Sequence, residues 1–414
     1  MQVVADVGGI PGKDCNGFCK YCYFRKVTEI KSFGCANCPP NKIGCERCSK
    51  GITDSQSEFK SPFEVISEVQ NALMMSMARG KINAYISGGG DISCYPHLET
   101  LVGNLNQFSI SSTLGYTSGK GISDSEVATR LINSGVEEVT FTVFSTSKEI
   151  RREWVKDKHP LESLEACKRF CENIKLTGAS VIIPGVNDGE VLREMCNDLE
   201  EWGAKGMLLM RFANTFNEGL ILGNGPILKD FESQPVEEFG ELVRQINKEY
   251  NFRVSGTPIC DPVTGGPFAI AKKENEVFLQ FIKPVTGEAT LITSKLAEPY
   301  ISRIFNRLNC DSVNVVGVEK EIACLITKED LENLDLSEIK DAVILPGRCF
   351  IHQLDAERIL SDDGVERVVG RGPDTLTVDG ELSIDMSDEN VIERELEQFN
   401  DLVDAINFFG MRLL

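Results

Sequence analysis

The stretch VVADVGGIPGKDCNGFCKYCYF, at residues 3–24, decides the fold of this chain. Its first part is apolar and breaks into a Gly/Pro loop, which predicts a short buried strand that ends in a turn. A CxxxCxxC triplet, Cys15, Cys19 and Cys22, follows at once. Because barrel-type folds place their chemistry at the carboxyl ends of their strands, the triplet predicts a metal site at that end of the first strand.

The triplet itself indicates an iron–sulfur cluster with one open iron. A [4Fe–4S] cube normally takes four thiolates, so a triplet tethers three irons and leaves the fourth free to bind a ligand. Zinc binding and three purely structural thiols are the alternatives that the spacing leaves open.

A second group of cysteines lies in the segment 24–60. Cys35, Cys38, Cys45 and Cys48 form two CxxC pairs. Four thiolates at this spacing predict a closed tetrahedral site for a single metal ion, with iron expected and zinc as the alternative. The expected role of this inserted metal loop is to fold a segment that is too polar to form a core.

The composition limits the class of protein. A chain of 414 residues, 42% of them hydrophobic, can form two or three domains. Its net charge of −20 repels nucleic-acid phosphates and anionic membranes, so neither is an expected partner. No apolar run approaches the roughly 20 residues of a membrane span, and the first residues lack the basic flank of a signal peptide. We therefore expect a cytoplasmic protein whose 15 cysteines are reduced or bind metal.

Strands and helices alternate after the cysteine-rich head. Ser61 and Glu64 form a capping box that predicts a helix over 61–79. Expected strands follow at 83–87, 108–117, 137–144, 177–183 and 206–212, and expected helices at 123–134, 161–174 and 189–201. With the first strand these make about six β/α units, which predict a parallel sheet with right-handed crossovers. For residues 1–225 we expect an α/β fold, a partial (β/α)6 barrel, with an open doubly wound sheet as the alternative.

The pattern changes in the second half of the chain. Residues 226–283 are predicted to be a linker region with one amphipathic helix near 235–249. The apolar runs EVFLQFI, ATLITSKL, VNVVGV, IACLIT and DAVILPG then predict short strands, with few long helices until about the last 25 residues. We therefore expect residues 284–414 to form a separate α+β domain.

The cysteine triplet and the turn Gly88-Gly89-Gly90-Asp91 after the second expected strand resemble the radical SAM superfamily over roughly residues 1–220. The resemblance implies a [4Fe–4S] cluster on the triplet, S-adenosylmethionine (SAM) on the open iron, and a glycine-rich turn that binds the methionyl ammonium. Asp91 stands where Glu is more usual. Without side chains, the glycines let the backbone approach a ligand closely, but an ordinary βα turn is the alternative.

The same resemblance implies further SAM contacts at strand ends: Thr117 and Ser118 toward the ribose, Ser145 after the fourth strand, and Pro184-Gly185 with Arg211 near the adenine and carboxylate. A Ser or Thr at a strand end can equally be a helix cap. Tyr23, next to Cys22, is expected to offer a phenolate to the open iron while no SAM is bound. Packing under the cluster is the alternative for Tyr23.

The chain as a whole resembles the methanogenesis marker family of cobalamin-dependent radical SAM enzymes, which C-methylate an arginine in the alpha subunit of methyl-coenzyme M reductase. The resemblance implies a protein substrate, an electron donor, and cobalamin bound by residues 284–414. The chain's histidines fit no DxHxxG motif, so we expect a cobalt without an imidazole ligand, over an apolar loop at Ile322–Leu325. Acidic groups are expected to hold the substrate guanidinium. Asp157 and the Glu and Asp residues of the acidic tail are the candidates, and the spacing selects none of them.

Two other functions fit part of the pattern. A radical SAM peptide maturase would use the four-cysteine site as an auxiliary metal site and would need no cobalamin. A non-catalytic iron–sulfur or zinc scaffold would not cleave SAM.

Overall fold

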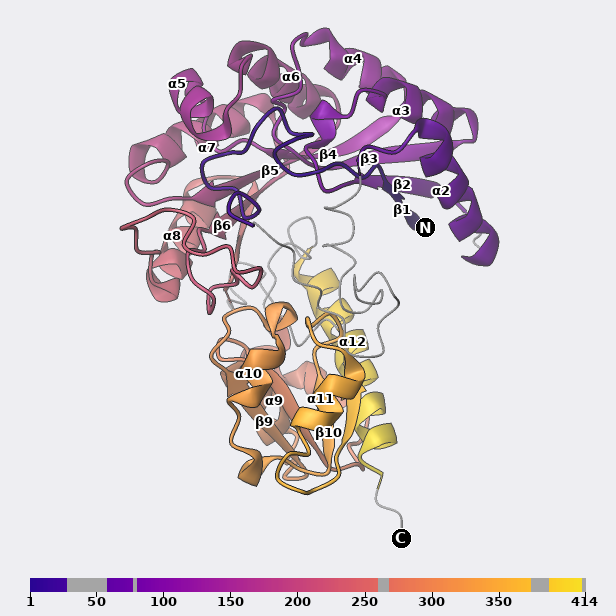
Figure 1. Ribbon diagram of the computed structural model, residues 1–414, viewed down its shortest axis with the longest axis vertical. Coiled ribbons are helices and arrows are strands. Elements are labelled where there is room, and N and C mark those ends of the chain that lie inside the picture. Colours follow the sequence, from indigo (N-terminus) through magenta and orange to yellow (C-terminus); the bar gives the residue numbers. More distant parts are fainter. Residues whose placement is uncertain (28–57, 77–79, 260–267, 374–386, 412–414) are drawn as a thin grey trace.

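The computed structural model describes residues 1–27, 58–76, 80–259, 268–373 and 387–411. They form two units, each built on one parallel sheet (Figure 1). None of the helices in these ranges has the length and apolar character of a membrane span.

The first sheet has seven strands in sequential order, and every neighbouring pair is parallel. The strands are β1 (Gln2–Asp6), β2 (Ile82–Ser87), β3 (Ile110–Thr117), β4 (Val136–Thr142), β5 (Lys175–Ile182), β6 (Gly206–Arg211) and β7 (Arg253–Thr257). Each crossover leads to the next strand with the same hand, so the sheet curls in one direction. In the described part of the chain, β1 and β7 are its two edges, which makes it a partial barrel.

Helices cover the convex outer face of this sheet (Figure 1). They are α2 (Pro62–Ser76), α3 (Leu98–Gln107), α4 (Glu126–Asn133), α6 (Pro160–Asn173), α7 (Gly189–Trp202) and α8 (Val236–Glu249). In α7, Leu192, Met195, Cys196 and Leu199 recur at helical spacing and are buried against the strands. The predicted capping box starts α2, because Ser61 and Glu64 each accept a backbone N–H bond from the other.

The prediction that residues 226–283 form a linker is wrong for the first part of this range, which completes the first sheet. Phe239 and Val243 of α8 and Val254 of β7 lie in the same core as the other strands. Strand β7 is only five residues long and runs into a Gly-Thr-Pro turn, so its own sequence carries little strand character. Pairing with β6 in register, rather than local pattern, makes it a strand.

A separate second unit follows, as expected. Its sheet has the order β11-β10-β8-β9, with strands β8 (Ala289–Ser294), β9 (Val313–Val318), β10 (Ala342–Leu345) and β11 (Val368–Arg371). All three neighbouring pairs are parallel, and the strands alternate with α9 (Glu298–Arg307), α10 (Lys328–Glu332) and α11 (Gln353–Ile359). The unit is thus α/β rather than α+β. The long helix α12 (Asp388–Phe409) packs on its core.

Two of the predicted strands are wrong. EVFLQFI forms a short 3-10 helix, η5 (Glu276–Phe281), and IACLIT contains another, η6 (Ala323–Leu325). Short apolar runs do not distinguish strands from buried turns by periodicity. In η5 the side chains of Val277 and Phe281 are exposed, so the run is not a fully buried strand.

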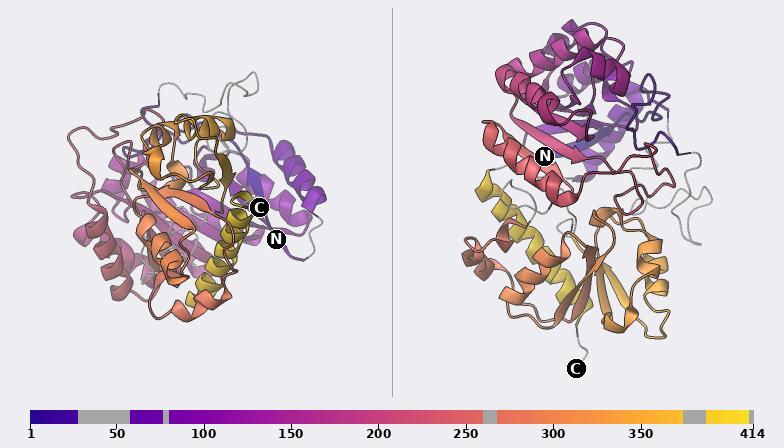
Figure 2. Two further views of the ribbon diagram at one scale, coloured as in Figure 1. Left: turned by 90° about the horizontal axis from the view of Figure 1, so that it is seen from below. Right: turned by 90° about the vertical axis from the view of Figure 1, so that its left-hand side faces the viewer.

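The carboxyl edges of the two sheets lie next to each other. Arg211, at the end of β6, bonds with Glu321, which follows the end of β9. The backbone N–H of Glu321 also donates to the carbonyl of Asn217, at 3.0 Å. Figure 2 shows the second unit and α12 against the lower side of the first unit. The loops that carry chemistry in such folds therefore meet at one junction.

Candidate functional site

The loop after β1 carries the cysteine triplet at the carboxyl edge of the first sheet. The thiol sulfur of Cys15 accepts a bond from the backbone N–H of Asp91, at 3.2 Å. The thiol of Cys19 donates to the carbonyl of Val155, at 3.3 Å. The loop is thus held between the turn after β2 and the segment after β4.

Burial raises the pKa of all three thiols, and that of Cys22 to about 12. For Cys22, the negative charges of Cys19 and Cys15 add to this effect, so the three groups lie in one electrostatic neighbourhood. Iron binds the thiolate, so a cluster bound here must displace the thiol protons.

Across the described ranges, no group of three or more His, Cys, Asp or Glu side chains converges as a single-ion site requires. The thiolates of a cube bind different iron atoms and need not converge on one point, so this finding concerns single-ion sites only. The predicted second metal site, Cys35, Cys38, Cys45 and Cys48, lies outside the described residues.

The glycine turn after β2 packs tightly against the cysteine loop. A Cβ at Gly88 would collide with the carbonyl oxygen of Gly8, and one at Gly90 would lie 3.3 Å from that of Asp14. The N–H of Gly89 donates to the carbonyl of Gly8, at 3.0 Å. The approach of the two backbone segments therefore requires glycine at position 88 and leaves little room for a side chain at position 90, whether or not a ligand binds.

The carboxylate of Asp91 links this turn to the end of β3. It accepts bonds from the backbone N–H of Ser93 and Ser118 and from the hydroxyls of Ser93, Thr117 and Ser118, at distances of 2.5 to 3.0 Å. The structure thus brings together four predicted SAM contacts, Asp91, Thr117, Ser118 and the glycines. The two hydroxyls bond Asp91 instead of capping a helix, and their contact with a ribose stays a prediction.

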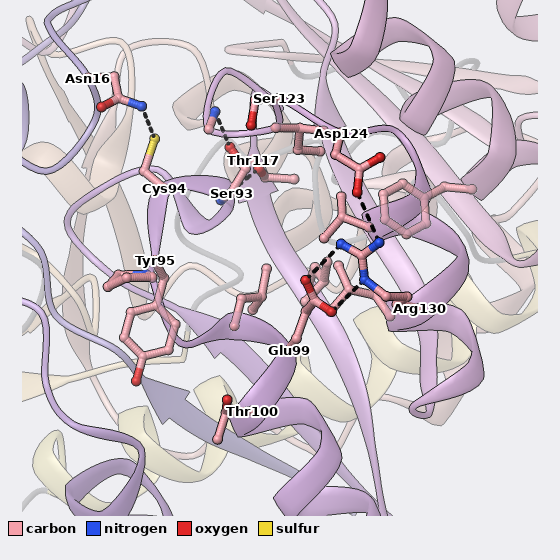
Figure 3. A pocket seen from close by; sticks show the side chains of 18 residues that line it. Asn16, Ser93, Cys94, Tyr95, Glu99, Thr100, Thr117, Ser123, Asp124 and Arg130 are labelled. Carbon is pink, nitrogen blue, oxygen red and sulfur yellow. Dashed lines mark hydrogen bonds and ion pairs between the residues drawn. The ribbon is translucent and has the colours of Figure 1, made fainter. Parts of the chain in front are cut away.

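A cavity of about 560 Å³ lies beside Asp91 (Figure 3). Cys94 and Thr117 line it, and the side-chain amide of Asn16 lies 3.5 Å from the sulfur of Cys94. Arg130, held by Glu99 and by Asp124, lines another part of the wall. Cys94 belongs to neither of the two cysteine groups that the sequence singled out, yet it lies beside the cysteine loop and lines this cavity.

Lys120 is a site residue that the sequence did not indicate. It is 3% exposed, and its Nζ donates to the carbonyl of Gly17 at 2.6 Å and to the sulfur of Cys19 at 3.5 Å. Burial lowers the pKa of Lys120, but Cys19, Asp91 and Cys15 outweigh this effect, so the pKa is raised overall. Nothing in the local run Ser-Gly-Lys-Gly predicts this position.

A buried ion pair lies at the same edge of the sheet, where β3 and β4 end. Arg151 and Asp157 are almost fully buried, and the Nη2 of Arg151 lies 2.8 Å from an oxygen of Asp157. Arg151 also donates to the carbonyls of Ser118 and Val143, at the ends of β3 and β4. The expectation that Asp157 holds a substrate guanidinium is therefore wrong, because this carboxylate is buried and already holds Arg151.

Ser145 is buried after β4, and its hydroxyl accepts a bond from the N–H of Ser147, at 3.1 Å. This bond closes a turn and is not a helix cap, because Ser147 is the residue that caps the short helix Lys148–Ile150. Gly185 takes a positive φ of 75° in the turn after β5. Neither position adds evidence for a SAM contact, which stays a prediction.

A second cavity of about 240 Å³ lies at the junction of the two units. Three predicted site residues from distant parts of the chain line it: Tyr23, Arg211 and Ile322. The Tyr23 hydroxyl donates to the carbonyl of Gly219 at 2.8 Å, and burial raises the pKa of Tyr23 to about 12. The role of Tyr23 at the iron stays a prediction.

Arg211 is buried in the wall of this junction cavity between carboxylates of both units. Its guanidinium bonds Glu321 and lies 3.3 Å from Glu218. Its Nε has no bonding partner among the described residues. Arg211 thus joins the two units, and its expected place near an adenine stays a prediction.

The family model of the radical SAM superfamily matches residues 10–195. The matched region includes the cysteine loop, the glycine turn and the strands β2 to β5. Residues 10–195 thus match a radical SAM domain, over somewhat less than half of the chain. A search of curated proteins gives no match.

Several solved structures are similar to parts of the chain at low identity. SuiB of Streptococcus suis, bound to its precursor peptide SuiA, is 13% identical, with a TM-score of 0.41 over 62% of this chain and 49% of that one. A radical SAM methyltransferase of Sphaerobacter thermophilus is 17% identical, with a TM-score of 0.39 over 61% and 64%. TsrM of Kitasatospora setae, with cobalamin and a [4Fe–4S] cluster bound, is 14% identical, with a TM-score of 0.30 over 37% and 29%. The chain spans about half the length of SuiB, and similarity at this level carries no information on substrate.

The residues present fit the cluster that a radical SAM domain requires. Three thiols lie on one loop at the carboxyl edge of the sheet, and Lys120 places a cation next to one of them. Buried negative charge needs such compensation, because it is poorly solvated away from water.

Proposed function

We propose that the protein is a cobalamin-dependent radical SAM methyltransferase that C-methylates an arginine side chain of methyl-coenzyme M reductase. The observation that carries the proposal is the junction at which the carboxyl edges of the two parallel sheets meet. A radical SAM domain needs only the first of these edges. The second edge provides a place for a second cofactor next to the first.

In the first unit, Cys15, Cys19 and Cys22 would hold the cluster, and the turn Gly88–Asp91 would hold SAM. When bound, the cluster and SAM supply a 5′-deoxyadenosyl radical that abstracts hydrogen from unactivated carbon. The chain's own residues position these groups: Asp91 fixes the turn on β3, and Arg151 fixes the ends of β3 and β4.

In the second unit, the strand order favours a ligand at one edge. Ligands of open α/β sheets bind outside the carboxyl ends of the strands, where the strand order reverses. Here the chain goes from β8 to β9 on one side and then returns to β10 on the other side of β8. The predicted crevice therefore lies after Ser294 and Leu345, at the edge that adjoins the first unit.

Apolar side chains at this junction suit a cobalamin without an imidazole ligand. Ile322 and Leu325 line the junction cavity, and Leu325 packs against Ile221 and Leu222, as does Phe24 at the end of the cysteine loop. His352 caps α11, where its Nδ1 accepts the N–H of Leu354 at 3.2 Å. When bound, cobalamin would supply the methyl group, and these apolar residues would help to hold it.

The junction cavity suits the reacting side chain better than a whole cofactor. Its volume of about 240 Å³ lies below the range of about 300–1,000 Å³ that is typical of small-molecule sites. Burial raises the pKa of Glu218, but bonds from Asn214 and the charge of Arg211 outweigh this and lower it. The carboxylate of Glu218 lines this cavity together with its partner Arg211, at 3.3 Å, so a substrate guanidinium bound here would share that carboxylate with Arg211.

The test is a methylation assay under strict anaerobiosis. Reconstituted protein is mixed with a synthetic arginine-containing peptide from the alpha subunit of methyl-coenzyme M reductase, SAM with a deuterated methyl group, a low-potential reductant, and methylcobalamin or none. We expect a deuterated methyl group on an arginine carbon, located by tandem mass spectrometry, only when cobalamin is present.

Two variants control this assay. Cys22→Ala should abolish both 5′-deoxyadenosine and methylated peptide, whereas Cys310→Ala, in the second unit, should change neither. A crosslinked or dehydrogenated peptide formed without cobalamin would support the peptide maturase instead. If the reconstituted protein releases no 5′-deoxyadenosine, the proposal is wrong and a scaffold is favoured.

A further inference from the structure

Lys120 is a buried cation beside the cysteine loop. Its Nζ lies 2.6 Å from the carbonyl of Gly17 and 3.5 Å from the sulfur of Cys19, and the residue is only 3% exposed. Its nearest bonding partners are therefore a backbone carbonyl and a predicted cluster ligand. A lysine in such a place loses its hydration and needs negative charge nearby.

No carboxylate in the described ranges forms an ion pair with Lys120. Asp91 is near enough to influence it, but its oxygens bond the hydroxyls and N–H groups of Ser93, Thr117 and Ser118. The other nearby groups that can become anionic are the thiols of Cys15 and Cys19. Loaded with iron, these thiolates would supply the negative charge that Lys120 requires.

The fold fixes the position of Lys120 through two glycines. Gly119 has a φ of +75°, a conformation that glycine adopts without strain. A Cβ at Gly121 would collide with the carbonyl of Ser93, and the N–H of Gly121 donates to the hydroxyl of Ser93 at 3.0 Å. The loop after β3 is thus packed closely against the segment after β2, which directs Lys120 toward the cysteine loop.

We propose that Lys120 compensates the negative charge of the iron–sulfur cluster and thereby raises its reduction potential. Reduction adds one negative charge to the cluster, and a cation at contact distance stabilises the reduced form more than the oxidised form. Lys120 is a positioning residue in this proposal, because it acts on the cluster and not on the substrate. The proposal rests on cluster binding by the triplet and is independent of methyl transfer.

The test measures the midpoint potential of the cluster in the absence of SAM, by redox titration monitored by electron paramagnetic resonance. Lys120→Met keeps the length of the side chain and removes its charge, and we expect a more negative midpoint potential. Lys120→Arg keeps the charge, so its midpoint potential should stay near that of the unmodified protein. Lys13→Met is the matched control, since Lys13 is exposed, pairs with Glu58, and lies on the cysteine loop itself.

Each outcome decides the proposal, once iron and sulfide content have been measured. If Lys120→Met shifts the potential no more than Lys13→Met does, the proposal is overturned, even when SAM affinity falls. If Lys120→Met loses its cluster while Lys120→Arg retains it with an unchanged potential, charge is the decisive property. If both variants lose the cluster, the lysine acts by shape and the proposal is wrong. A failed methylation assay would leave these potentials, and this inference, unaffected.

Discussion

Each sheet has an arginine that ties neighbouring loops together at its carboxyl edge, but the two arginines do so differently. Arg151, at the first edge, is fully buried and paired with Asp157, and it bonds the ends of β3 and β4. Arg371, at the second edge, is half-buried and donates to carbonyls of the loop after β10, including Cys349 at 3.3 Å. No carboxylate of the described chain forms an ion pair with Arg371.

The difference indicates how tightly each edge is held. Removal of one partner of a buried ion pair lowers the free energy of unfolding strongly, because the other charge stays buried without compensation. Bonds to neutral carbonyls leave no buried charge behind. We therefore infer that the cluster edge is fixed in advance, while the edge that is proposed to bind the second cofactor rearranges at lower cost.

The largest expected effect is that of Arg151→Met. This substitution leaves Asp157 buried without its partner, which should lower the free energy of unfolding by about 3–5 kcal/mol. Anaerobic denaturant titration measures the loss, and the iron content should fall as well. Arg152→Met, on the exposed neighbour, should change stability by no more than about 0.5 kcal/mol. A similar small loss for Arg151→Met would contradict the assigned role of the ion pair.

A smaller effect is expected for Arg371→Met. The substitution removes charge-assisted bonds to carbonyls without burying an unpaired charge, so we expect a loss of about 1.5–3 kcal/mol. The same denaturant titration measures it, and the iron content should stay that of the unmodified protein. Loss of iron, or a cost equal to that of Arg151→Met, would remove the distinction between the two edges. Arg358→Met, on the exposed side of α11, serves as the control.

The smallest expected effect is a pH dependence in the second unit. Burial raises the pKa of Glu395 on α12 to about 7, although the N–H groups of Ile270 and Ala269 bond its carboxylate and oppose the shift. The folded state then binds a proton more readily than the unfolded state, so stability falls as pH rises. Between about pH 6 and about pH 8 the fall should be about 1 kcal/mol.

Glu395→Gln tests this assignment, because its side chain does not titrate. Its stability should not fall over the same interval beyond the dependence that other groups cause. If the variant and the unmodified protein show parallel pH profiles, Glu395 does not titrate there.

The chemistry of the first unit could be predicted largely from local sequence. The spacing of Cys15, Cys19 and Cys22 and the run Gly88–Asp91 identify the superfamily, because ligand spacing and glycine turns are properties of a few consecutive residues. The strands up to β6 were also predictable, because each is a short apolar run and segments with helical periodicity lie between these runs. The specific substrate and cobalamin stay proposals, because no local motif encodes them.

Other features depended on long-range contacts. Strand β7 exists because it pairs with β6, and the parallel order of the second sheet depends on how its crossovers pack. Asp157 was expected to face a substrate, but the fold pairs it with Arg151. Thr117 and Ser118 bond Asp91, a partner that lies in the preceding loop.

The sequence by itself determined the strands of the first sheet up to β6 and which cysteines can hold a cluster. These properties depend on the periodicity of apolar residues and on spacing within a short loop. Only the tertiary structure decided which buried charges meet at the site. Lys120 and Gly17 are 103 positions apart, and they come into contact because the loops after β1 and β3 share one edge of the sheet. The pairing of a buried charge is a property of that edge, and no single segment of the chain encodes it.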